Sequence, residues 1–267
     1  MTQPLPITTA VALPVWPNSH RALPNALARS ALFNTASARK GERERYWQHE
    51  VPVPQGTRML YTGEELRQDD EDVYLQVLHL ARLEGLGDEV FFTAHAMLVE
   101  VGWTVNSKSY ERLSACLYRL TAATVSLTVQ DKRGLRETYA GSLLRSFRWR
   151  ESPDGPPLSQ WRVRVEPELA ALFDPAYYSR VVWAMRLELP PLGKWLHMHY
   201  STHAYPFPVR VATLHKLCGS DTVQLKQWRY KLKIALAALV ESGFFLSAHI
   251  DPKTDLVHVE RKYQVEA

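Results

Sequence analysis

A dense run of basic side chains near the carboxyl end of the chain is its strongest chemical signal. The run consists of Lys226, Arg229, Lys231 and Lys233, and no acidic residue follows before Glu241. Ammonium and guanidinium groups at this density suit the phosphates of a polyanion such as a nucleic acid. The alternative is a basic helix face that only meets solvent.

The spacing of apolar residues predicts that this run lies on one long helix over residues 221–243. Apolar side chains recur at intervals of three and four residues, which places them on a single buried face. The residues of that face are Leu225, Trp228, Leu232, Ala235, Leu236 and Leu239. The opposite face then carries Gln227, Tyr230 and Ile234.

The outward residues divide by the part of a duplex that each could contact. Gln227 can pair with adenine, Lys226 can reach the acceptors of guanine, and Ile234 can touch a thymine methyl group. Tyr230 points outward beside them. By contrast, the positions of Arg229, Lys231 and Lys233 favour contacts with backbone phosphates.

The residues around the long helix predict a winged helix. Gly219 can end a short preceding helix, and Asp221 with Gln224 forms a plausible capping pair for the long one. Two strand-like runs follow at 244–250 and 256–261, separated by a loop that carries Lys253. In such a domain the long helix enters the major groove and the hairpin touches the backbone beside it.

The same order of elements is expected upstream, with a weaker basic face. A strand at 90–92 precedes helices at 94–101 and 107–120, and a hairpin is expected from 124 onward. The DNA-facing candidates here are Lys108 and Arg112 on the second helix, beside Glu111, and Lys132 and Arg133 in the hairpin turn. Further strands at 143–149 and 160–165 carry Arg162 and Arg164, which could meet phosphate or solvent.

The chain of 267 residues, with 46% hydrophobic residues and a formal charge of only +4, is therefore expected to be an α+β protein of two tandem winged helices. We expect an extended amino-terminal arm over 1–50, a first winged helix over 51–178 that supports and dimerises, and a second over 179–267 that reads DNA. Within the arm, Leu32 and Phe33 form an aliphatic-aromatic pair. Such a pair either docks into a partner or pins the arm to its own domain.

Catalytic chemistry is not indicated by any motif. The phosphate-binding loop G-x-x-x-x-G-K-[ST] is absent, so nucleotide hydrolysis is not expected. His197, His199 and His203 include a pair at helical spacing, but no acidic or cysteine partner accompanies them. We therefore expect no enzyme activity, no cofactor and no metal. Without an apolar run long enough for a membrane or a signal segment, a cytoplasmic location is expected.

The arm RALPNALARSALFN and the patterns LHKLCGSD and LKQWRYKLKIALAALVE resemble the TrfA family of plasmid replication initiators. This resemblance implies binding to direct repeats (iterons) at a plasmid origin, opening of the origin, and a homodimer in equilibrium with a monomer. It also implies recruitment of the host DnaA, the DnaB helicase and the polymerase sliding clamp, with single-stranded origin DNA as a further partner. Leu32 and Phe33 match the end of the family's clamp-binding peptide, whereas Arg29 stands where that peptide has glutamine.

Other functions stay open on the sequence. A winged-helix transcriptional repressor would carry the same helix, but repressors typically bind palindromes as symmetric dimers. An adaptor that uses the basic helix against an acidic partner would show no preference for a DNA sequence. A nuclease is disfavoured because no metal-binding carboxylate cluster is evident.

Overall fold

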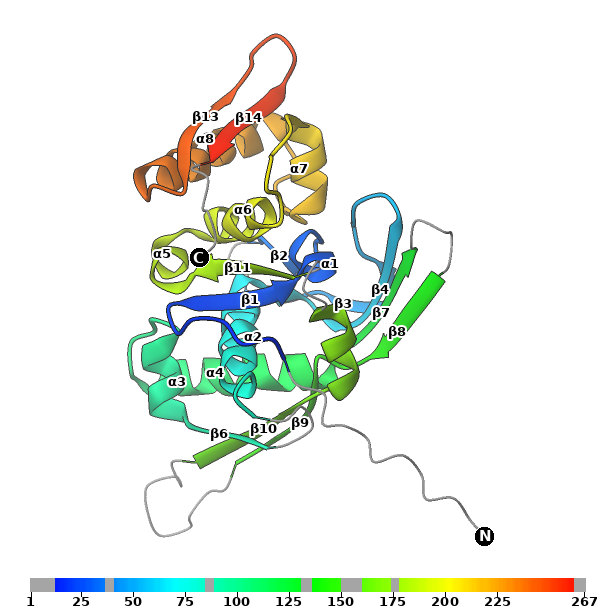
Figure 1. The fold of residues 1–267 in the computed structure, drawn as a ribbon, viewed down its shortest axis with the longest axis vertical. Helices are drawn as coiled ribbons and strands as arrows, with labels where there is room; N and C mark the ends of the chain where they lie inside the picture. Colours follow the sequence, from blue (N-terminus) through cyan, green and yellow to red (C-terminus); the bar gives the residue numbers. More distant parts are fainter. Residues whose placement is uncertain are drawn as a thin grey trace.

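Most of the α+β fold consists of two groups of elements (Figure 1). In each group a helix and a strand are followed by two helices and a β-hairpin. The structure is a computed structural model that describes residues 13–36, 41–84, 89–130, 136–149, 160–173 and 178–261. We call the two groups the first unit and the second unit. In the described ranges, the helices are all too short or too polar to cross a lipid bilayer.

The first unit comprises α2 (Gln68–Ala81), β6 (Val90–Thr93), α3 (Ala94–Glu100), α4 (Ser107–Ala122), β9 (Leu144–Arg148) and β10 (Gln160–Val165). Its strands form a three-stranded antiparallel sheet in the order β6-β10-β9. Thr93 caps α3 by accepting a hydrogen bond from the amide of Ala96, and Asn106 caps α4 by accepting one from Ser109.

The second unit repeats this order with α6 (Pro191–Ser201), β12 (Val209–Arg210), α7 (Val211–Leu217), α8 (Leu225–Glu241), β13 (Phe245–Ile250) and β14 (Leu256–Arg261). Its sheet has the order β12-β14-β13. In both units the strand before the helix pair is hydrogen-bonded to the last strand of the hairpin. This unit stands at the top of Figure 1.

The hairpin predicted from residue 124 is present, but its strands belong to another sheet and not to the sheet of the first unit. β7 (Thr124–Gln130) pairs with β8 (Arg136–Gly141) and with β4 (Thr57–Glu64), and β3 (Arg45–Glu50) completes the order β3-β4-β7-β8. Val125 and Leu127 join the core with Met59 and Tyr61. The hairpin of the first unit is instead formed by β9 and β10.

The extended arm predicted over 1–50 is also wrong where the structure describes it, because the segment is packed into the fold. β1 (His20–Pro24) pairs with β11 (Tyr178–Val182), α1 (Asn25–Ala28) follows, and β2 (Phe33–Asn34) runs parallel to β5 (Leu66–Arg67). The β1–β11 pair lies between α6 and α2 in Figure 1. Strand pairing and burial together explain why this segment does not extend into solvent.

Leu32 and Phe33 are 3% and 2% exposed and belong to the core of the first unit. Their side chains are therefore closed to a partner, and the predicted docking peptide at these two residues is wrong for this fold. The other interpretation of the pair, that it pins the segment to its own domain, agrees with this burial.

The hydrophobic core divides between the two units near the start of α6. The first core includes Val181 and Trp183, whereas the second begins with Leu189. The expected boundary after residue 178 thus falls inside β11, since β11 pairs with β1. The remaining elements are η1 (Pro167–Phe173) and α5 (Trp183–Glu188), and α5 leads the chain from one core to the other.

Candidate nucleic-acid interface

Helix α8 presents the face that its periodicity predicts. Its buried residues are Trp228, Leu232, Ala235, Leu236 and Leu239, and Leu225 is half-buried. On the opposite side Tyr230 is 69% exposed and Ile234 is 50% exposed. Lys226, Gln227, Lys231 and Lys233 are exposed as well. The helix therefore offers solvent a polar and basic surface with two bulky side chains within it.

The turn before α8 is fixed by contacts that differ from the predicted cap. Gly219 follows α7 with φ +58, the left-handed backbone that glycine adopts readily. Gln224 precedes α8 but makes no capping hydrogen bond through its side chain, so the predicted Asp221 and Gln224 pair is wrong. Instead His215 Nε2 hydrogen-bonds the carbonyl oxygen of Thr222 at 2.9 Å.

Lys231 holds the same turn from the helix side. Its ammonium group donates to the Thr222 hydroxyl at 2.8 Å. Lys231 is thus committed to the protein as well as exposed to solvent. A contact between Lys231 and a DNA phosphate would compete with that hydrogen bond. Lys231 is therefore a weaker candidate for a contact with the DNA backbone.

Arg229 joins α8 to the hairpin. Its Nε atom donates to Asp255 Oδ1 at 3.0 Å and its Nη2 atom to Oδ2 at 2.9 Å, a bidentate pair. The hydrogen bonds that Arg229 donates to Asp255 raise the pKa of Arg229, so the guanidinium group stays protonated. Because the guanidinium already binds a carboxylate, we assign Arg229 to positioning the hairpin, where the sequence analysis expected a phosphate contact.

The hairpin loop is ordered around Asp251 and presents Lys253 to solvent. Asp251 accepts hydrogen bonds from the Lys253 amide at 2.8 Å and the Thr254 hydroxyl at 2.7 Å. These bonds lower the pKa of Asp251, so its carboxylate stays ionised and keeps the turn closed. The exposed Lys253 side chain therefore extends from a defined turn beside α8.

The first unit has a weaker basic face. Lys108 is exposed at the start of α4. The Arg112 guanidinium lies 3.9 Å from the centroid of the Trp103 ring and 3.2 Å from Asp69, so it is already engaged. Lys132 and Arg133 lie outside the described residues.

The sequence profile of the TrfA protein family matches residues 8–261. The chain belongs to the TrfA family.

The TrfA-family chain is 34% identical over 248 residues to the plasmid replication initiator protein TrfA of Escherichia coli. That match takes in 92% of this chain and 63% of the relative, so the chain spans less than two thirds of the relative's length. Among solved structures, a crystal structure of selenomethionine derivatives of domains 2 and 3 of RctB superposes with a TM-score of 0.62 at 13% identity. This superposition covers 91% of the present chain and 99% of that one. A second crystal structure of RctB domains 2-3 gives 0.57 at 11% identity, covering 87% and 94%. At these identities the RctB structures support the fold alone.

The structure of the TrfA-family chain also places basic residues on the β9–β10 hairpin. Sequence reasoning predicted these two strands but did not identify them as the hairpin of the first unit. Arg148 on β9 and Arg162 on β10 are neighbours in register, and Arg164 lies on the same strand as Arg162. Arg162 and Arg164 lie 3.2 and 3.6 Å from Glu89, which partly neutralises them. The alternation of arginine with apolar residues was visible in the sequence, but it did not show that these strands pair with β6.

The histidines of α6 face the core of the TrfA-family chain. His197 and His199 are buried, and burial lowers the pKa of each to about 3, so both imidazoles are neutral. In the ranges that the structure describes, no three histidine, cysteine or carboxylate side chains gather as metal ligands would. Packing accounts for these histidines.

Proposed function

We propose that this chain is a plasmid replication initiator whose two units are tandem winged helices. In this proposal α8 enters the major groove of a directly repeated site, and the β13–β14 hairpin follows the adjacent backbone. Gln227, Lys226 and Ile234 contact base edges, with Tyr230 beside them, while Lys233 and Lys253 contact phosphates. The first unit adds DNA contacts through Lys108 on α4 and through Arg148 on β9 of its own hairpin.

The observation that carries the proposal is the outward face of α8. Its basic side chains are exposed, the helix holds no acid before its last residue, and a bidentate pair fixes the hairpin next to it. A helix face that only meets solvent does not require a hairpin held in register beside it. The membership of the TrfA family supports the origin of a plasmid as the target.

The remaining steps rest on the family resemblance. We propose that the protein acts without enzymatic activity in the cytoplasm and opens the origin with binding energy, where it also meets single-stranded DNA. Its host partners in this proposal are DnaA and the DnaB helicase. The first unit supplies the contacts of a homodimer that competes with DNA-bound monomer.

The test is a footprint of the purified chain on the DNA that adjoins its own gene. We expect several protected repeats in one direction beside an A/T-rich stretch. A single palindromic site would instead favour a transcriptional repressor. Equal protection of unrelated DNA would contradict sequence-specific initiation and would favour an adaptor that binds acidic partners.

A further inference from the structure

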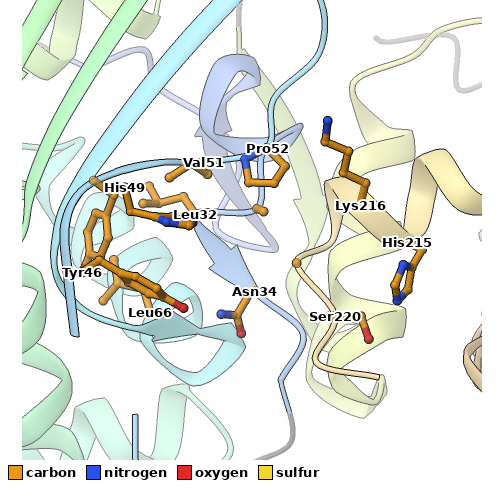
Figure 2. Close-up of a pocket in the computed structure, with 13 residues that line it drawn as sticks. Leu32, Asn34, Tyr46, His49, Val51, Pro52, Leu66, His215, Lys216 and Ser220 are labelled. Atoms are coloured by element: carbon orange, nitrogen blue, oxygen red, sulfur yellow. The ribbon is translucent and has the colours of Figure 1, made fainter. Parts of the chain in front are cut away.

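A cleft of about 410 Å³ lies between the segments around β2, β3 and β5 and the second unit, and no function described above uses it. Figure 2 shows its two walls: Tyr46, Leu66, Leu32 and Val51 on one side, and His215, Lys216 and Ser220 on the other. The first wall belongs to the segments around β2, β3 and β5, and the second to the end of α7 and the turn that follows.

The base of the cleft is a close contact between the amino-terminal segment and the second unit. The Thr35 amide donates to the Cys218 carbonyl at 3.0 Å. A Cβ atom on Gly219 would lie 2.8 Å from Asn34 Cβ and 3.1 Å from Ala31 Cβ, so only glycine permits this approach. The two walls are therefore held together at a fixed point, which gives the cleft a defined shape.

The polar groups of the cleft suit an anion. Its lining includes Lys216, His49 and His215 but no acidic residue, among the residues that the structure describes. Lys216 is exposed and forms no ion pair with any described residue. The carboxylate of Glu65, which accepts a hydrogen bond from the lining residue Asn34, is neutralised by Arg67 at 2.6 Å. An ammonium group without a counter-ion among the described residues favours a phosphate or carboxylate.

The opposite wall suits a planar ring. The rings of Tyr46 and His49 stack with centroids 4.5 Å apart and an angle of 27° between their planes. The Tyr61 ring meets Tyr46 edge-on at 6.2 Å, and Leu32 and Val51 continue the apolar surface. An aromatic or heterocyclic ring gains both stacking and apolar burial against such a wall.

We propose that this cleft binds a small molecule that joins a planar ring to a phosphate, as a nucleoside monophosphate does. The ring lies on the Tyr46 and His49 wall, and the phosphate is held by Lys216 on the opposite wall. Since one wall is the turn that leads into α8, a bound molecule bridges the segments around β2, β3 and β5 and the second unit, next to the proposed DNA-reading helix. This inference goes beyond the proposed function, and its test requires no duplex DNA.

The test is isothermal titration of the full chain with AMP, and separately with adenosine, inorganic phosphate and a short 5′-phosphorylated oligonucleotide. We expect saturable binding of AMP and at least about tenfold weaker binding of adenosine and of phosphate alone, because each lacks half of the contacts. Binding of the oligonucleotide in preference to AMP assigns the ligand to the end of a strand, and the reverse assigns it to a free nucleotide.

Three variants make the result specific to the cleft. Lys216→Ala should weaken AMP binding about tenfold, and Lys216→Arg should restore most of it. Arg145→Ala removes the same charge from an exposed position on β9 and should change nothing. Failure of both AMP and the oligonucleotide to bind at millimolar concentration would overturn the proposal. Equal losses for Lys216→Ala and Arg145→Ala would overturn it as well, because binding would then depend on overall charge.

Discussion

The basic side chains of α8 differ in their contacts, although they form one continuous basic run in the sequence. Arg229 binds Asp255 and Lys231 binds Thr222, so both have a partner within the protein. Lys226, Gln227 and Lys233 are exposed and extend from the helix. Within the part of the chain that the structure describes, these three side chains make no hydrogen bond or ion pair that DNA binding would break.

We predict that Gln227→Ala and Lys233→Ala weaken DNA binding in different ways. A side chain that reads a base loses about 1–3 kcal/mol on the cognate repeat and relaxes preference at one position. Loss of one phosphate contact instead weakens binding to every sequence and lowers the salt slope by about one. The measurement is a titration of each variant against cognate and scrambled repeats at several salt concentrations.

Lys231→Ala serves as a comparison in the same titrations. Because Lys231 already donates to Thr222, we expect this change to reduce the salt slope less than Lys233→Ala does. Identical behaviour of the Gln227 and Lys233 variants would show that α8 does not lie in the groove as proposed.

At the scale of elements, helices were easier to predict than the partners of strands. The buried face of α8 and the cap of α4 follow from local spacing and from the residue before each helix. Strand pairing depends on segments far apart in the chain, such as β7 with β4 and β10 with β6. The β7–β8 and β9–β10 hairpins both alternate apolar and polar residues, so the pattern alone could not show which of them pairs with β6.

The contact between α8 and its hairpin should be measurable as a coupling between Arg229 and Asp255. Asp255 has φ +54, which asparagine tolerates, so Asp255→Asn removes the charge with little backbone strain. In a double-mutant cycle with Arg229→Gln we expect a coupling of about 0.5–1 kcal/mol, since the pair is partly exposed. Urea denaturation at low and high salt provides the measurement.

The same four proteins then test whether the pair positions the hairpin. If it does, Arg229→Gln and Asp255→Asn weaken DNA binding by similar factors, even though one change removes a positive charge and the other a negative one. Weaker binding for Arg229→Gln together with tighter binding for Asp255→Asn would instead indicate that Arg229 contacts phosphate directly.

At the scale of the whole molecule, the sequence did not reveal how closely the amino-terminal segment and the two units pack. Prolines and the lack of a long period around residues 13–36 suggested an arm, yet β1 finds its partner in β11, more than half the chain away. Similarly, the acids at the start of α2 resemble an ordinary helix-capping run. In the fold, Asp72 is instead almost fully buried and faces the second unit.

Asp72 connects α2 of the first unit to α5 and α6. Its Oδ1 atom accepts a hydrogen bond from Arg186 Nε at 2.8 Å, and its Oδ2 atom accepts one from Lys194. Arg186 is fully buried and also lies 3.2 Å from Glu71 and 3.1 Å from Gln68. Removal of the Asp72 carboxylate takes one ion-pair partner from Arg186 and one from Lys194 in an almost fully buried site.

We therefore predict that Asp72→Asn lowers the free energy of unfolding by about 3 kcal/mol or more, because breaking a buried ion pair leaves uncompensated charge. Glu50→Gln is the matched control: Glu50 and Arg58 are 72% and 66% exposed and 3.7 Å apart, so its loss should cost less than about 1 kcal/mol. Urea unfolding followed by both circular dichroism and tryptophan fluorescence measures the effect and tests whether the two units unfold together. Equal stability of the two variants would contradict the assignment of Asp72 as the ionic link between units, whereas separate transitions in Asp72→Asn alone would show that this carboxylate couples their unfolding.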